Sequence, residues 1–171
     1  DLLNKARKLA HDINNKRGMI NYVGMNYQLP GNKIIRYDGR IGKRTGAIAS
    51  MVPNFKYVST ATVSRAQADE ILRKVKRHCQ FIQVYFTRLE QVLQGSSEQM
   101  FNNEVKEFLP KAKKRAGEAV ELIRSYLAEL DKTGKTGQGS GLGTVVKNQL
   151  QSIAVGGLLL ALAAGFSGAT A

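Results

Sequence analysis

Residues 64–94, SRAQADEILRKVKRHCQFIQVYFTRLEQVLQ, carry the most regular pattern in the chain and decide the expected fold. Apolar side chains recur there at alternating steps of four and three residues, the spacing of a helix packed along a neighbour at a coiled-coil angle. The positions of this seam are Ala68, Leu72, Val75, Cys79, Ile82, Phe86, Leu89 and Leu93. Ser64 and Gln67 form a capping-box pattern at the start. We therefore predict a long helix over this segment.

A second amphipathic segment follows almost at once. Between residues 98 and 131 apolar side chains again recur at helical spacing, which predicts a second helix. We expect that helix to kink or restart at Pro110, because proline cannot donate an interior backbone hydrogen bond. Only a Gly-Ser-Ser link at residues 95–97 separates the two helices, and so short a link favours an antiparallel pair. The sequence therefore predicts a long helical hairpin over residues 64–131.

Two shorter segments precede the hairpin. Residues 1–18 predict a basic N-terminal helix, with its apolar side chains on one face and Gly18 where such a helix would end. Residues 19–63 are rich in β-branched and aromatic side chains and contain the turn signal Pro30-Gly31. This composition favours a small basic β-hairpin, or an extended arm that becomes ordered only against a partner.

The C-terminal region differs sharply from the rest of the chain. Residues 132–143 (KTGKTGQGSGLG) have the composition of a glycine-rich linker, and no charged side chain follows Lys147. A helix of residues 153–171 would be roughly 28 Å long, close to the hydrocarbon thickness of a bilayer. We therefore predict a hydrophobic, membrane-inserting helix within residues 144–171. Burial of that helix at a tight protein interface is the alternative.

Small side chains recur at every fourth residue of this C-terminal helix, and large apolar side chains cover its other faces. Such a stripe lets two helices approach closely in a membrane. The residues expected to pack against lipid or another helix are Gly157, Leu158, Leu160, Ala161, Gly165, Phe166 and Ala169. The expected fold class is mainly α, with a helical hairpin, a small β or extended arm and a hydrophobic C-terminal helix.

The charge of the chain points to anionic partners. Lysine and arginine outnumber aspartate and glutamate by 26 to 13, giving a net charge of +13, which suits nucleic acid, anionic lipid or an acidic protein. In the segment 33–44 basic side chains alternate with apolar ones, as in sites that contact phosphate. The candidate polyanion-binding residues are Lys33, Arg36, Arg40, Lys43 and Arg44. The alternative is a solvated hairpin that is basic only because the whole protein is.

Motifs for catalysis and bound cofactors fail on inspection. Gly134-Lys135-Thr136 resembles the end of a phosphate-binding loop, but Glu129 stands where the opening glycine belongs. Cys79 is the only cysteine, which excludes an intrachain disulfide and a Cys-rich zinc site. Carboxylates three residues apart on a helix, such as Glu118 and Glu121, are ordinarily solvated and paired with neighbouring lysines. We therefore expect neither enzymatic activity nor a metal or cofactor.

These features together favour a non-enzymatic structural component of a larger assembly, of the kind that is carried inside a virion and ejected or that builds a secretion channel. Its tail would insert in a membrane, and its basic body would contact other subunits, further copies of the chain, anionic lipid or nucleic acid. We expect it to be membrane-associated, inside a virion before delivery, and not stabilised by disulfides. Two alternatives stay open: a sequence-independent nucleic-acid-packaging protein that oligomerises through its tail, and a pore-forming toxin.

Overall fold

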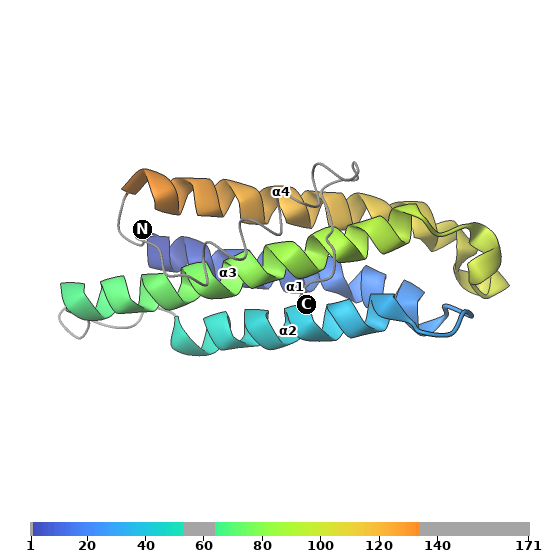
Figure 1. Cartoon of the computed structure of the whole chain (residues 1–171), viewed down its shortest axis with the longest axis horizontal. Coiled ribbons are helices and arrows are strands. Elements are labelled where there is room, and N and C mark those ends of the chain that lie inside the picture. The colour runs from blue at the N-terminus through green and yellow to red at the C-terminus, as the bar shows by residue number, and fades with distance from the viewer. Residues whose placement is uncertain (1, 53–63, 134–171) are drawn as a thin grey trace.

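The computed structural model describes residues 2–52 and 64–133 of the chain (Figure 1). These residues form four α-helices and two short 3-10 helices: α1 (Leu2–Met25), α2 (Lys33–Met51), α3 (Arg65–Gln94), η3 (Glu98–Met100), η4 (Asn103–Phe108) and α4 (Leu109–Thr133). No strand occurs in this part of the chain, and its single isolated β-bridge joins Tyr27 to Phe101. The protein is thus mainly helical over its described length.

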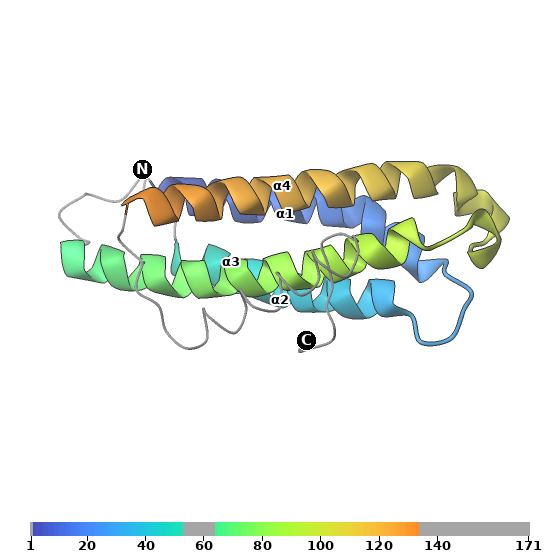
Figure 2. The same cartoon turned by 45° about the horizontal axis from the view of Figure 1, so that its top comes forward.

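The four helices pack side by side as a bundle in which consecutive helices run antiparallel (Figures 1 and 2). Each helix contacts two neighbours extensively, in the cyclic order α1, α2, α3, α4 and back to α1. This is the up-and-down arrangement of a four-helix bundle, with one apolar core along its axis. The predicted pair at 64–131 is therefore not a separate hairpin but half of this bundle.

The predicted seam of α3 is buried in that core. Seven of its eight positions are buried, and Ala68 at the start of the helix is half-buried. The predicted capping box is also confirmed, because Ser64 accepts from the Gln67 backbone while the Gln67 side chain accepts from the Ser64 backbone. The alternating spacing thus identified both the helix and its core-facing side.

The predicted β-hairpin or extended arm is wrong for the described part of residues 19–63. Residues 33–51 form α2, whose N-cap is Asn32, and its side chain accepts from the Ile35 backbone at 3.3 Å. Isoleucines at steps of seven residues, Ile34, Ile41 and Ile48, lie on its core face with at most 1% exposure. Burial on one helical face outweighs the strand preference of single β-branched residues, because strand propensity is itself largely a matter of packing.

The Pro30-Gly31 turn exists, but it joins two helices rather than two strands. Gly31 has φ +69°, a left-handed conformation that glycine adopts without a steric cost. Helix α1 likewise extends past the predicted boundary at Gly18 and ends at Met25. Ile20 and Val23 lie fully in the core and continue the buried face of α1. Their burial offsets the conformational cost of a glycine inside the helix.

The connection between α3 and α4 is longer than predicted. Helix α4 begins at Leu109, so Pro110 lies in its first turn, where a backbone N–H would have no partner within the helix. The preceding residues 95–108 contain η3 and η4 and close one end of the bundle. The Gln28 backbone donates to Met100 at 2.7 Å, and the Asn102 backbone donates to Asn26 at 3.2 Å. These bonds tie the two connections at that end together.

The predicted linker beyond Thr133 and the predicted hydrophobic helix within residues 144–171 lie outside the described residues, as do residues 53–63 of the predicted arm. Within residues 2–52 and 64–133, no helix is both long and apolar enough to cross a bilayer. Cys79 is buried with a free thiol, and as the only cysteine of the chain it cannot form an intrachain disulfide.

Candidate polyanion-binding face

The five basic residues predicted to bind polyanions lie on one face of α2. At about 100° per residue, the spacing of a regular α-helix places them within an arc of roughly 100°. The exposed ones are Lys33, Arg36 and Lys43, and the half-buried ones are Arg40 and Arg44. The helix therefore gathers these residues on one side, although a hairpin was predicted here, and their binding of polyanions stays a prediction.

Two of these arginines lie over tyrosine rings. The Arg36 guanidinium carbon is 5.3 Å from the centre of the Tyr37 ring. The Arg40 guanidinium carbon is 6.0 Å from Tyr37 and 5.7 Å from Tyr85 of α3, so it lies between a ring of each helix. Such cation–π contacts attract a guanidinium to the face of a ring. They favour this position of the cation while its N–H groups can still donate to an acceptor.

Arg44 makes the shortest of these cation–π contacts. Its guanidinium carbon lies 4.1 Å from the centre of the Phe81 ring. Its Nη1 lies 3.3 Å from Nδ1 of His78, one turn before Phe81 on α3. Arg44 therefore contacts both a phenyl ring and an imidazole of α3.

The three rings form a continuous support beneath the arginines. Tyr37 and Tyr85 are stacked at 6.5 Å between ring centres, and Phe81 and Tyr85 at 6.2 Å. Tyr37 and Tyr85 are only 8% and 7% exposed, so these two offer little ring surface to a ligand. We call the whole arrangement the arginine–aromatic row, which consists of Arg36, Arg40, Arg44, Tyr37, Phe81 and Tyr85.

A fourth arginine lies beside this row. Arg88 of α3 is 5% exposed, and burial lowers its pKa to about 10, an effect that the neighbouring Tyr37 hydroxyl opposes by hydrogen bonding. A guanidinium with that pKa remains charged at neutral pH. Arg88 therefore adds positive potential to the same face.

The only acid of α2 does not lie on this face. Asp38 is 2% exposed and accepts from Arg17 of α1 through both oxygens, at 2.8 Å and 3.1 Å. In the part of the chain that the structure describes, no carboxylate pairs with Arg36, Arg40 or Arg44. Three other carboxylates form ion pairs between helices, and all three lie on α4: Lys5–Glu129, Lys16–Glu118 and Lys76–Asp131. The positive charge of these three arginines on α2 is therefore not offset by an ion pair within the described residues.

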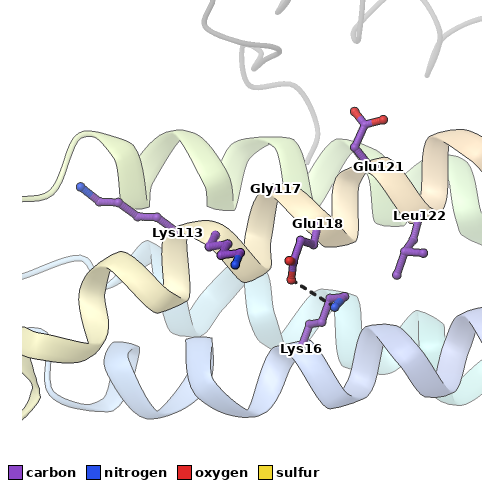
Figure 3. Close-up of a pocket in the computed structure, with 7 residues that line it drawn as sticks. Lys16, Lys113, Gly117, Glu118, Glu121 and Leu122 are labelled. Atoms are coloured by element: carbon purple, nitrogen blue, oxygen red, sulfur yellow. Dashed lines mark hydrogen bonds and ion pairs between the residues drawn. The ribbon is translucent and has the colours of Figure 1, made fainter.

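A shallow pocket on the opposite side of the bundle has a different character. It has a volume of about 560 Å³ and lies between α1 and α4, as Figure 3 shows. Lys16 reaches across it to Glu118 at 3.3 Å, and Glu121 pairs with Arg124. The two carboxylates that are three residues apart thus form ion pairs with separate partners. Mixed charges and an open shape give this pocket no arrangement that would bind a particular ligand.

The other candidate groups do not assemble into a reactive site. Burial raises the pKa of the Cys79 thiol to about 12, so the thiol stays protonated and a weak nucleophile. Among residues 2–52 and 64–133, no three His, Cys, Asp or Glu side chains come together as metal ligands would. The candidate packing residues of the tail, from Gly157 to Ala169, lie outside the described residues.

Sequence reasoning missed the contribution of α3 to the arginine–aromatic row. Phe81 and Tyr85 lie outside the predicted seam of eight positions. Two aromatic residues four apart beside a core seam were the available signal, because they share one helical face. Comparison of the chain with protein-family models, with curated proteins and with solved structures gave no match.

Proposed function

We propose that the four-helix body binds nucleic acid without sequence preference, and that the protein is a non-enzymatic component of a larger assembly. The observation that supports this proposal is the arginine–aromatic row. It presents three fixed guanidinium groups along α2, about 6 Å apart by the rise of four helical residues, and no acid interrupts them. Guanidinium groups donate in a planar fork that suits phosphate oxygens.

The same face favours nucleic acid over a lipid surface. Interfacial binding to lipid needs exposed apolar side chains as well as positive charge. In the described residues, the exposed large hydrophobic side chains are Tyr22, Met25 and Leu29, all on α1 or the connection after it. None lies on the face formed by α2 and α3. A row of cations over buried rings instead suits a chain of phosphates.

Sequence preference is not expected from this geometry. Reading base edges requires side chains that enter a groove and meet bases in a defined pattern. Here the arginines lie against their own rings, and the buried tyrosines offer little surface on which bases could stack. Binding would therefore come mainly from phosphate contacts and the release of counterions.

The proposal is tested by binding of fluorescent oligothymidylate over a range of salt concentrations. Arg36, Arg40 and Arg44 are replaced together by Gln, and the control replaces Arg7, Lys111 and Lys114 of α1 and α4, with the same loss of charge. For single strands the slope of log K against log salt changes by about 0.7 per phosphate contact. The slope of the first variant should therefore be smaller in magnitude by about 2, and this variant should bind more weakly.

Two outcomes would contradict the proposal. Equal losses in the test and control variants would mean that net charge alone drives binding. Binding to vesicles containing phosphatidylserine, together with no binding to oligothymidylate or duplex DNA, would assign the face to lipid instead.

The uncharged C-terminal tail supports a second part of the proposal, that the tail anchors this body in a membrane. The supporting observation is the composition of residues 148–171, which hold no charged side chain. Vesicle flotation that persists at high salt and is lost on deletion of residues 148–171 would agree with insertion. On insertion-based scales Leu160→Arg should cost about 2.5–3.5 kcal/mol at the bilayer centre. Unchanged flotation of the deletion variant would rule out this role.

A further inference from the structure

The contact between Arg44 and His78 favours one protonation state of the imidazole. Nη1 of Arg44 lies 3.3 Å from Nδ1 of His78. A guanidinium can only donate, so a hydrogen bond at this contact requires Nδ1 to accept. The contact therefore favours the neutral ring with its hydrogen on Nε2. Protonation of Nδ1 would remove this acceptor and place two cations against each other.

The groups around His78 favour this neutral form. Its pKa lies below the ordinary value for histidine, first because burial disfavours the charged ring and then because Arg44 and Arg77 repel it. On the α4 side, this stretch of α3 meets Tyr126, which lies near Cys79, and Asp131, which pairs with Lys76. Among the described residues, no carboxylate reaches His78 to offset the repulsion.

A bound phosphate chain would reverse this balance. Its negative charge at Arg44 would fall within a few ångströms of His78, and an adjacent anion favours the protonated imidazole. The protonated ring could no longer accept from Arg44, but both groups could then donate to phosphate oxygens. We propose that nucleic acid binds to the arginine–aromatic row together with a proton on His78, so that binding tightens as the pH falls.

This inference rests on the proposed nucleic-acid binding and adds a residue and a regulating condition to that site. The direction follows from linkage: the group binds its proton more tightly in the complex than in the free protein, so lowering the pH favours the complex. The effect falls between the pKa of free His78 and its higher value in the complex. One proton is involved, so log Kd should change by at most about one unit per pH unit.

Oligothymidylate is a suitable probe, because thymine and phosphodiesters do not titrate in the range where histidine does. We expect the wild-type Kd to fall as the pH is lowered from about 7.5 through the range in which histidine titrates, by at most about tenfold for each unit by which binding raises the His78 pKa. His78→Asn places an amide oxygen near the position of Nδ1, which can accept from Arg44 but cannot take up a proton. This variant should lose most of the pH dependence.

His11→Asn is the matched control, because His11 is the only other histidine and is exposed on α1. It should keep the pH dependence of the wild type. The nuclear magnetic resonance titration of the His78 ring provides a second readout: its pKa should rise when oligothymidylate is added. Equal pH dependence in His78→Asn and the wild type, or an unchanged His78 pKa, would overturn the inference while leaving nucleic-acid binding in place. Absence of binding at every pH would overturn both.

Discussion

The carboxylate of Asp38 lies between α1 and α2, where Arg17 donates to both of its oxygens and Asn21 donates to one at 3.0 Å. Thr45 completes the network by donating to Asn14, which also accepts from Arg17. This buried network joins the two helices at a defined register. It also withdraws the one acid of α2 from the outer face, which leaves the arginine–aromatic row uniformly positive.

Asp38→Asn is expected to destabilise the protein by about 3 kcal/mol, because it leaves the largely buried Arg17 without a charged partner. The measurement is urea unfolding followed by circular dichroism. Asp12→Asn is the control, since Asp12 pairs with Lys8 on the surface, where such pairs contribute about 0.3–0.5 kcal/mol. Similar effects of the two changes would mean that the Asp38 network does not set the packing of α1 on α2.

Glu90 gives a prediction about pH. Its pKa is raised, chiefly by burial and further by Glu121, although Arg124 opposes the shift. The folded state therefore holds this proton more tightly than the unfolded state, and stability falls as the pH rises through the raised pKa. Glu90→Gln should increase the Tm near pH 7 and have little effect near pH 4. The exposed Glu104→Gln is the control, and no gain from Glu90→Gln at neutral pH would contradict the prediction.

At the scale of elements, α2 depends on packing more than on intrinsic helix propensity. It contains Gly39, Gly42 and Gly46, and glycine inside a helix costs about 0.5–1 kcal/mol relative to alanine. An added Cβ at Gly39 or Gly46 would meet nothing within 4 Å. At Gly42 it would come within 2.5 Å of Arg17 Nη2, which is held by Asp38. Within the described bundle, packing therefore requires a glycine at only one of these three positions, Gly42.

Gly39→Ala and Gly46→Ala should each stabilise the protein by about 0.5–1 kcal/mol, because alanine restricts the unfolded chain and keeps the helix. Gly24→Ala should do the opposite by about 1–3 kcal/mol, since its Cβ would lie 2.6 Å from Ile34 Cγ2 where α1 meets α2. Thermal unfolding measures all three. A gain in stability for Gly24→Ala would show that α1 and α2 do not approach as closely as described.

The sequence allowed α3 to be predicted well and α2 poorly, for physical reasons. In α3 one apolar seam runs through good helix-forming residues, so propensity and periodicity agree. In α2 the isoleucines and glycines favour strand or turn locally, and only contacts with α1 and α3 select the helix. The cluster of basic residues could be recognised even so, because local charge density does not depend on secondary structure, and its role as a site stays a prediction. The contacts of Phe81 and His78 with Arg44 could not be predicted, because they form across the interface between two helices.

At the scale of the whole molecule, charge is separated between faces. Ion pairs connect α1 with α4 and α3 with α4, whereas no carboxylate of the described residues pairs with Arg36, Arg40 or Arg44 on α2. All residues of the arginine–aromatic row lie between positions 36 and 85, within the described bundle. Nucleic-acid binding and membrane association would therefore belong to separate parts of the chain.

Deletion of residues 148–171 is accordingly expected to leave both the affinity for oligothymidylate and its salt dependence unchanged, while flotation with vesicles is lost. Fluorescence anisotropy on the full chain and the deletion variant at equal protein concentration measures the first effect. A large loss of affinity on deletion would mean that the tail brings several bodies together on one strand, which is the packaging alternative.

The closed ring of helices also has a mechanical consequence. Leu2 and the end of α4 lie at the same end of the bundle, where the Tyr126 hydroxyl donates to Leu2 and Lys5 pairs with Glu129 (Figure 2). A force applied between these two ends would peel α1 from α4, breaking these contacts one after another rather than all at once. Helices α2 and α3, which carry the arginine–aromatic row, would bear that load last. The body would thus yield at low tension, and a nucleic acid bound as proposed would be released last.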